Sequence, residues 1–396
     1  MVRSVAGHRL CACVTLSILS FAAQFPSPTP TANTDPKFDG KFRASHTKGV
    51  EEAYLSTLFP ISHAANLVKL RNGDLLCFWF SGTGEGESNV AIVMSRLAKG
   101  AAEWSKPVEI DHQAGKSFQN PVAFEAPDGR LWLVHTSQPA GEGQRNAEVL
   151  YLTSDNGGQA WTKPRPLFAQ PGSFVRQPPV LLNKEEWLLP MYYTPTRGIT
   201  DGAESHYSAM KITRDGGKSW KECTVPQSSG LVQPSVLRLA NGHFLGFFRS
   251  RYADFIYKST SQNGCDWTAP APTRLPNNNS SIQAVLLRDG SVAIAFNNSN
   301  AGVSRYKTRT SVRKPLSIAL SPDGGDTWPW VRDIETGTQP PRAHEEYSYP
   351  SLLQTGGKVF VAYSFCRDTI KVVRFDPQWI KEGETAGKFK GDKPQS

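Results

Sequence analysis

Short apolar segments separated by polar turns recur six times along the chain. Each unit reads as an apolar strand, a turn containing Gly or Asn, a second apolar strand, a polar loop and a third strand. The six units begin HAANLVKLRNGDLLCFWFSG, QNPVAFEAPDGRLWLVHTSQ, RQPPVLLNKEEWLLPMYYTP, VQPSVLRLANGHFLGFFRSR, SIQAVLLRDGSVAIAFNNSN and SYPSLLQTGGKVFVAYSFCR. The strands are rich in β-branched and aromatic residues, and no segment has a sustained helical period. The pattern predicts an all-β fold in one domain, a six-bladed β-propeller of four-stranded antiparallel blades.

A second pattern, SPDGGDTW at Ser321–Trp328, follows the third strand of a unit. Related stretches are TRDGGKSW, SDNGGQAW, the shorter SQNGCDW and a worn copy at the end of MSRLAKGAAEW. Their tryptophans lie at positions 104, 161, 220, 267 and 328, separated by 57, 59, 47 and 61 residues. In a tight turn Asp or Asn accepts backbone hydrogen bonds, Gly adopts positive φ, Ser or Thr bonds the other limb and Trp covers the turn. We interpret the motif as structural.

This turn motif resembles the Asp-box, or BNR repeat, of the sialidase (neuraminidase) superfamily, where it joins the third and fourth strands of each propeller blade. The resemblance covers almost all of residues 50–375 and implies a sialidase-like propeller that has diverged from true sialidases. The last unit lacks a motif of its own. We expect the strand-like segment EEAYLSTLF, which precedes the first unit, to close the ring by pairing there.

The two ends of the chain differ from the six units in composition. Residues 1–23 contain two Arg ahead of an apolar run that is too short to span a membrane, which is typical of a secretory signal peptide. We expect residues 24–48 to form a Pro- and Thr-rich linker, residues 49–378 the propeller, and residues 379–396 a disordered polar tail. The protein is then secreted or periplasmic, with no stable membrane anchor after signal removal.

Net charge limits the class of binding partner, and cysteine spacing argues against a metal site. Loss of Arg3 and Arg9 with the signal lowers the net charge from +9 to +7, and the remaining charge is spread without a dense basic run. This favours an anionic partner and argues against nucleic acid, which requires a clustered patch. Four cysteines remain without metal-binding spacing, and both disulfides and free thiols fit them: Cys77, Cys223, Cys265 and Cys366.

Superposing the six units places one residue of each at the start of the innermost strand, facing the axis. These residues are His63, Asn120, Gln177, Gln233, Gln283 and Tyr349. Antiparallel order brings the loops after the second strands to the same end of the axis, and these loops carry Glu85, Glu87, Arg249, Arg251 and Arg367. A tyrosine and a histidine facing each other beside arginines suit acid–base or nucleophilic chemistry on an anionic sugar. The Asn and Gln residues fit equally well a structural role, satisfying backbone groups at a crowded axis.

The sialidase resemblance implies roles for two of these residues. In sialidases three arginines bind the substrate carboxylate, a tyrosine paired with a glutamate is the nucleophile, and an aspartate near the first blade is the acid/base. Tyr349, in SYPSLL, matches the nucleophile, and Arg249, at the end of the second strand of the fourth unit, matches one of the arginines. A neutral tyrosine avoids the repulsion that a carboxylate nucleophile would feel toward an anionic substrate.

Three positions depart from the sialidase pattern. His63 stands where the first arginine is expected, Gln233 stands where the glutamate is expected, and the loop after the first unit offers Glu85 or Glu87 in place of the aspartate. Loss of a charge-assisted contact to a carboxylate costs about 1.5–3 kcal/mol. The departures argue against strict exo-α-sialidase activity.

These features predict a secreted, sialidase-like glycoside hydrolase that removes a terminal acidic sugar, sialic acid or a relative, from a glycan, and that needs no cofactor or metal. Tyr349 would be the nucleophile or proton carrier, and Glu85 or Glu87 the acid/base. His63 and Arg249 would hold the anionic group. The other candidates for substrate contact are Arg251, Arg367, Asn120, Gln177, Gln233, Tyr193 and Glu346.

Two other function classes stay open at this point. In a polysaccharide lyase, His63 and Tyr349 would exchange protons with a uronate-containing glycan. A glycan-binding propeller would hold the same ligand without cleaving it. The products separate the three classes, since a hydrolase releases a saturated sugar, a lyase an unsaturated uronate, and a binding protein neither.

Overall fold

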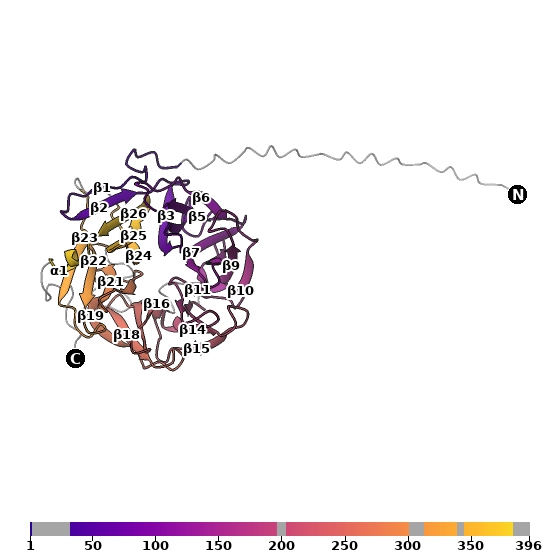
Figure 1. Ribbon diagram of the computed structural model, residues 1–396. Helices are drawn as coiled ribbons and strands as arrows, with labels where there is room; N and C mark the ends of the chain where they lie inside the picture. Colours follow the sequence, from indigo (N-terminus) through magenta and orange to yellow (C-terminus); the bar gives the residue numbers. More distant parts are fainter. Residues whose placement is uncertain (2–31, 196–202, 301–312, 339–343, 383–396) are drawn as a thin grey trace.

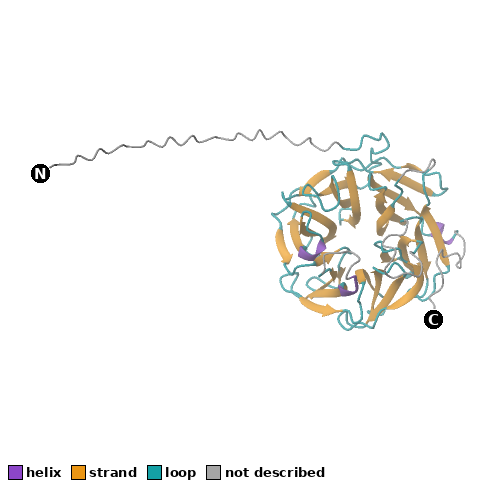
Figure 2. Ribbon diagram, turned by 180° about the vertical axis from the view of Figure 1, so that it is seen from behind, coloured by secondary structure: helices purple, strands orange, loops and turns teal. Residues whose placement is uncertain are grey.

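The computed structural model describes residues 32–195, 203–300, 313–338 and 344–382, besides Met1. Within these ranges six antiparallel sheets surround a central axis, and helix is limited to three short segments (Figures 1 and 2). The molecule is a six-bladed β-propeller, which confirms the predicted fold class. The described helices are too short to cross a bilayer.

Each blade runs from an inner strand at the axis to an outer strand at the rim. Blade one contains β3 (Ile61–Lys69), β4 (Leu75–Gly82), β5 (Ala91–Leu97) and β6 (Val108–Asp111), and blade two contains β7 (Lys116–Glu125), β8 (Leu131–Pro139), β9 (Glu148–Ser154) and β10 (Arg165–Phe168). In blade three the inner position is split between β11 (Ser173–Val175) and β12 (Val180–Leu181), which pair with β13 (Trp187–Tyr193), followed by β14 (Tyr207–Thr213) and β15 (Lys221–Thr224).

The second half of the ring repeats this order. Blade four contains β16 (Leu231–Arg238), β17 (Phe244–Ser250), β18 (Phe255–Ser261) and β19 (Ala271–Pro276), and blade five contains β20 (Gln283–Leu286), β21 (Val292–Asn297), β22 (Leu316–Ser321) and β23 (Trp330–Glu335). Blade six contains β24 (Tyr347–Thr355), β25 (Lys358–Phe365) and β26 (Thr369–Phe375) from the end of the chain. Every connection joins sequence neighbours, as the repeat pattern requires.

The ring closes through the start of the chain. Strand β2 (Val50–Tyr54) lies antiparallel to β26 and supplies the outer strand of blade six (Figure 1). This confirms the pairing expected of EEAYLSTLF. The buried Lys371 Nζ strengthens the seam, because it lies 3.0 Å from Glu52 Oε2 on β2 and 2.6 Å from Glu335 Oε2 on blade five.

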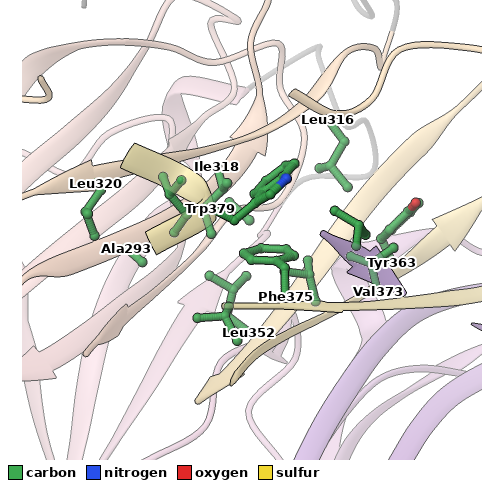
Figure 3. Close-up of a cluster of buried hydrophobic side chains, with 14 of the residues drawn as sticks. Ala293, Leu316, Ile318, Leu320, Leu352, Tyr363, Val373, Phe375 and Trp379 are labelled. Atoms are coloured by element: carbon green, nitrogen blue, oxygen red, sulfur yellow. The ribbon is translucent and has the colours of Figure 1, made fainter. Parts of the chain in front are cut away.

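Apolar side chains fill the spaces between neighbouring blades. Between blades five and six, Ile318 and Leu320 of β22 lie against Leu352 of β24 and Phe375 of β26 (Figure 3). Trp379 of the short helix α1 (Gln378–Lys381) lies in the same cluster, with its ring centroid 4.6 Å from that of Phe375. Separate apolar clusters of this kind lie between the other neighbouring blades.

The packed structure extends beyond the predicted boundaries of the propeller at both ends. Trp379 and Ile380 are buried, so the packed structure continues beyond the predicted boundary at residue 378. At the other end, β1 (Arg43–Ala44) pairs with β2, and Phe38 is buried, so the last part of the predicted linker is also packed. Phe38 anchors one segment and Trp379 the other. A prediction from overall composition does not detect such single aromatic anchors. The predicted signal peptide and most of the predicted tail lie outside the described residues.

The Asp-box turns of blades two to five pack against the preceding blade. In blade five, Ser321 Oγ accepts a hydrogen bond from the backbone N–H of Gly325 (2.7 Å), and Asp323 Oδ1 accepts one from that of Thr327 (2.8 Å). Gly325 has φ +85°, and a Cβ there would lie 2.7 Å from the Phe247 ring of blade four. Trp328 is buried against the same ring. The motif has the structural role predicted for it.

One disulfide crosses a blade boundary. Cys223 on β15 of blade three is bonded to Cys265, which lies in the shortened Asp-box of blade four. Cys77 is a buried free thiol. The sequence left this pairing open.

A bulge interrupts the inner strand in four of the six blades at the same position. The pairing shifts register there, and the residue at the centre of each bulge has positive φ: Ala64, Asn120, Gln233 and Tyr349, at 62°, 49°, 54° and 55°. Such residues re-aim side chains toward the axis. In blade one the central residue is Ala64, so His63 lies one position earlier in the ring than we predicted.

The hydrogen bonds of the Asp-box lead to a stability prediction. Asp323→Ala should lower the free energy of unfolding by about 1 kcal/mol, because Asp323 accepts hydrogen bonds from Thr327 and Ser321. Denaturant unfolding followed by tryptophan fluorescence measures the change. Asp326→Ala is the matched control, since among the described residues Asp326 forms an ion pair with Lys258 alone, and it should cost less than about 0.5 kcal/mol. Equal losses in the two variants would contradict the role assigned to the turn.

Candidate active site

Tyr349 lies at the centre of the bulge in β24, near the axis. Its side chain is 8% exposed, and its Oη accepts a hydrogen bond of 2.7 Å from Arg249 Nη1. Arg249 is the penultimate residue of β17 on blade four, so the bond joins two blades. A phenol held by a guanidinium is stabilised in its ionised form.

Neutral amides hold Arg249 in place. Its Nε and Nη2 donate to Asn279 Oδ1 (3.0 and 2.9 Å), and its Nη1 also donates to Gln233 Oε1 (3.0 Å). Among the described residues Arg249 has no carboxylate partner, so its charge is not neutralised locally. Gln233 thus orients the arginine in the place where the sialidase resemblance implies a glutamate.

The amide chain continues around the axis through Tyr192. Gln233 Nε2 and Asn120 Nδ2 both donate to Tyr192 Oη, at 3.3 and 3.2 Å. The structure therefore brings Asn120 and Gln233 into the cluster around Tyr349, as predicted. Tyr192 joins blades two, three and four at this point.

Three guanidinium groups surround the ring of Tyr349. The Cζ atoms of Arg176, Arg249 and Arg313 lie 5.3, 5.6 and 5.5 Å from its centroid. Burial alone would raise the pKa of Tyr349, but the charges of Arg249 and Arg313 outweigh that effect and lower the pKa to about 8. A minority of the phenol, about a tenth, is then ionised at pH 7, and the ionised form dominates above pH 8.

Two carboxylates balance part of this charge at the mouth. Glu346 Oε1 lies 2.8 Å from Arg313 Nη1 and 3.1 Å from Arg367 Nε, and Glu85 Oε2 lies 2.6 Å from Arg367 Nη1. Burial would raise the pKa of Glu346, but Arg313 and Arg367 hold it below its ordinary value. Glu346 is therefore an ionised counter-charge, and Glu85 is the more exposed carboxylate beside it.

His63 packs directly against Tyr349. Their ring centroids are 4.3 Å apart, and His63 Nδ1 lies 3.9 Å from Glu346 Oε1, beyond hydrogen-bond distance. Neither ring nitrogen has a hydrogen-bond partner in the described part of the chain. Burial, and then the charges of Arg367 and Arg313, hold the pKa of His63 well below its ordinary value. The imidazole is neutral, so it has no positive charge with which to hold an anion.

Arg251 is also buried close to the cluster. Its Nη2 donates to Gln144 Oε1 (3.3 Å), at the start of the short helix η1 (Gln144–Asn146) on blade two. Burial and the neighbouring Arg249 lower the pKa of Arg251 to about 10, which leaves it charged at neutral pH. Arg251 and Arg249 are therefore neighbouring charges, whereas Arg367 lies at the mouth on Glu85 and Glu346.

Three predicted site residues lie elsewhere. Tyr193 donates its hydroxyl to Glu222 and stacks on Tyr207, because adjacent residues of a strand face opposite sides, and Tyr192 takes the axial side. Gln177 Nε2 donates to the carbonyl oxygen of Ile282 (2.5 Å). It therefore has the structural role that we weighed for the axial amides.

Glu87 is the third residue outside the cluster. It is exposed in the same loop as Glu85, whereas Glu85 is the residue that contacts Arg367. In the described ranges no group of three His, Cys, Asp or Glu side chains is placed to hold a metal ion.

The sequence reasoning missed four residues of the cluster: Arg176, Tyr192, Asn279 and Arg313. Arg176 directly precedes the predicted ring residue Gln177, and strand alternation would have placed Tyr192 at the axis. Arg313 lies outside the six repeated units, where the repeat alignment carries no information. Asn279 lies just before the fifth unit, at a bulge-like residue with φ 59°.

Comparison with known proteins places this propeller in a family. The BNR repeat-like domain model matches residues 73–361. The chain belongs to the BNR repeat-like domain family. The match agrees with the BNR repeats identified in the sequence. A comparison of the sequence with curated proteins gives no match.

Solved structures share the fold at low sequence identity. The Hadza microbial sialidase Hz136 is 15% identical, with a TM-score of 0.65, over 81% of this chain and 66% of that one. The intramolecular trans-sialidase from Ruminococcus gnavus is 13% identical, with a TM-score of 0.63, over 88% and 97%. A protein of unknown function from Dyadobacter fermentans is 17% identical, with a TM-score of 0.64, over 83% and 100%. This BNR-repeat chain therefore spans about two thirds of the length of the Hadza sialidase, and the likeness establishes its fold.

The arginine cluster predicts an unusually acidic tyrosine. Tyr349 should ionise near pH 8, which a difference titration of tyrosinate absorbance between the protein and Tyr349→Phe measures. Arg249→Met should move this titration by about one pH unit or more to the alkaline side, because it removes the closest positive charge. If Tyr349→Phe leaves the titration between about pH 7 and 9 unchanged, the electrostatic account of the site is wrong.

Proposed function

We propose that this protein is a glycoside hydrolase that removes a terminal acidic sugar from a glycan, with Tyr349 as the nucleophile. The observation that carries the proposal is the bond of 2.7 Å from Arg249 to the Tyr349 hydroxyl, within a group of guanidiniums. Such a group stabilises both a phenolate and an anionic substrate. The family and the sialidase-like fold support a glycan as the substrate class.

The nucleophile in this proposal is activated by charge in place of a neighbouring base. Gln233 cannot accept the phenolic proton, but Arg249 and Arg313 already favour its loss. The phenolate attacks the anomeric carbon, the glycosidic bond breaks, and the leaving oxygen takes a proton. Water then hydrolyses the sugar–tyrosine bond and restores Tyr349.

Glu85 is our candidate for the group that passes a proton from solvent water to the leaving oxygen, because its carboxylate is ion-paired with Arg367 and has no proton of its own to give. It follows β4 at the mouth, its side chain is 34% exposed, and it is tied to Arg367. Glu346 is more buried and forms ion pairs with two arginines, which suits a fixed counter-charge. Arg251 and Arg367 complete the positive surface toward the substrate's acidic group.

We also propose that the protein is exported. The amino-terminal pattern of a signal peptide motivates this, and so does the disulfide between Cys223 and Cys265, since disulfides persist in oxidising compartments. Periplasmic and secreted locations both meet this condition.

One observation favours a second candidate, a polysaccharide lyase. His63 is neutral, its ring nitrogens have no hydrogen-bond partner in the described residues, and it packs on Tyr349. A neutral imidazole beside a phenol can take the proton α to a uronate carboxylate while the phenol protonates the leaving oxygen. This candidate acts at the same site, so only the products distinguish it.

The direct test is a screen of sialosides and uronate-containing oligosaccharides with mass spectrometry of the products. The proposal expects a saturated acidic monosaccharide, and Tyr349→Phe should lower kcat at least about 100-fold. The rate kcat/KM should rise with pH and level off above about pH 8, because the ionised phenol is the reactive form. An unsaturated uronate product would establish the lyase, and near-normal turnover by Tyr349→Phe would remove the proposed centre.

Gln233→Glu tests how the tyrosine is activated. A carboxylate at this position would lie beside Arg249 and offset its charge, so the titration of Tyr349 and the pH profile of kcat/KM should both move to higher pH. Gln233→Ala is the control for loss of the hydrogen bond without added charge. If Gln233→Glu raises kcat/KM strongly and leaves its pH profile unchanged, then the reaction in the parent protein is limited by the lack of a base and not by the charge around Tyr349.

A further inference from the structure

Arg176 spans the central axis of the propeller. It follows β11 on blade three, and its Nη2 donates to the carbonyl oxygens of Tyr349 (3.0 Å) and Pro350 (3.1 Å) on blade six. Its side chain is 1% exposed. Blades three and six are half a turn apart in a ring of six, so the side chain bridges opposite walls of the channel.

The bond falls on the bulge that carries the tyrosine. Tyr349 has φ 55°, a conformation that a residue with a side chain adopts at an energetic cost, and its own carbonyl and the next one are the two acceptors. The equivalent bulge residues Ala64, Asn120 and Gln233 receive no side-chain hydrogen bond on their carbonyls from the described part of the chain. The clamp is specific to the blade with the tyrosine.

Packing alone does not account for an arginine at this position. Its Nε and Nη1 have no hydrogen-bond partner among the described residues, and no carboxylate pairs with it there. Burial lowers the pKa of Arg176 to about 10, so it is still charged at neutral pH. A buried charge without a counter-ion is costly. Its Cζ lies 5.3 Å from the Tyr349 ring centroid, where the charge acts on the phenol.

We propose that Arg176 is a positioning residue for Tyr349: from the opposite blade it fixes the backbone bulge that aims the phenol, and it holds a positive charge against the ring. The catalytic part of this inference rests on the proposed function of Tyr349. The structural part does not, because the direction and ionisation of the phenol can be measured without turnover.

The experiment compares Arg176→Met and Arg176→Lys with the parent protein. Arg176→Met removes the donors and the charge at similar side-chain length, so the Tyr349 titration should move to the alkaline side, by less than in Arg249→Met. On a glycoside that the parent protein cleaves, kcat should fall about 10- to 100-fold while KM changes less than about threefold, since misplacement of a reacting group mainly affects the chemical step. Arg176→Lys keeps the charge, so the titration of Tyr349 should stay close to that of the parent protein. Its kcat should lie between the values of the parent protein and of Arg176→Met.

Gln177→Ala is the matched control. Gln177 is the next residue and also reaches across the axis, but to Ile282 on blade five, away from Tyr349. It should lower the melting temperature and leave the titration of Tyr349 and kcat unchanged. If Arg176→Met lowers the melting temperature but leaves the titration and kcat unchanged, Arg176 is structural only and the proposal fails.

Two further outcomes are decided by the same measurements. If Arg176→Met does not fold, Arg176→Lys is tested alone, and parent-like kcat together with a parent-like titration overturns the positioning role. If no glycoside is cleaved, the proposed function fails, but the titrations of the Met and Lys variants still confirm or overturn the placement of the tyrosine by Arg176.

Discussion

A ring of blades is stable only if its first and last strands meet, because an open ring would expose two unpaired sheet edges. In this protein β2 meets β26, and the buried Lys371 joins the two strands to blade five. Blade six, which carries Tyr349, is therefore built from both ends of the folded chain. Its position relative to blades three and four depends on this closure, and so does every contact that Arg176 and Arg249 make with the tyrosine.

The axis that this closure creates is rich in positive charge. Arg249 is held by the amides of Gln233 and Asn279, whereas the carboxylates of Glu85 and Glu346 lie at the mouth on Arg367 and Arg313. Because amides orient a guanidinium without cancelling its charge, the positive potential is directed at the phenol and the space above it. With the neutral Gln233 beside Arg249, ionisation of the tyrosine depends on the neighbouring guanidiniums and not on a carboxylate at this position.

The fold was predictable because it depends on repeated, local signals. Strand alternation, turn residues and the Asp-box recur in each unit, so an error in one unit is corrected by the others. The site depends on single residues, and there the repeat fails. A bulge shifts His63 by one position, alternation exchanges Tyr193 for Tyr192, and Arg176 reaches its partners from half a ring away. Long-range contacts of this kind leave no periodic trace in the sequence.

The disulfide has a consequence for limited proteolysis. The bond joins Cys223 and Cys265, which are 42 positions apart, and the loop that it closes includes β16 and β17, the strands that carry Gln233 and Arg249. A protease that nicks the chain inside this loop would leave a two-chain molecule with both fragments covalently attached. Only reduction would separate them, so fragment release in the presence and absence of thiols distinguishes cuts within this covalent loop from cuts elsewhere in the ring.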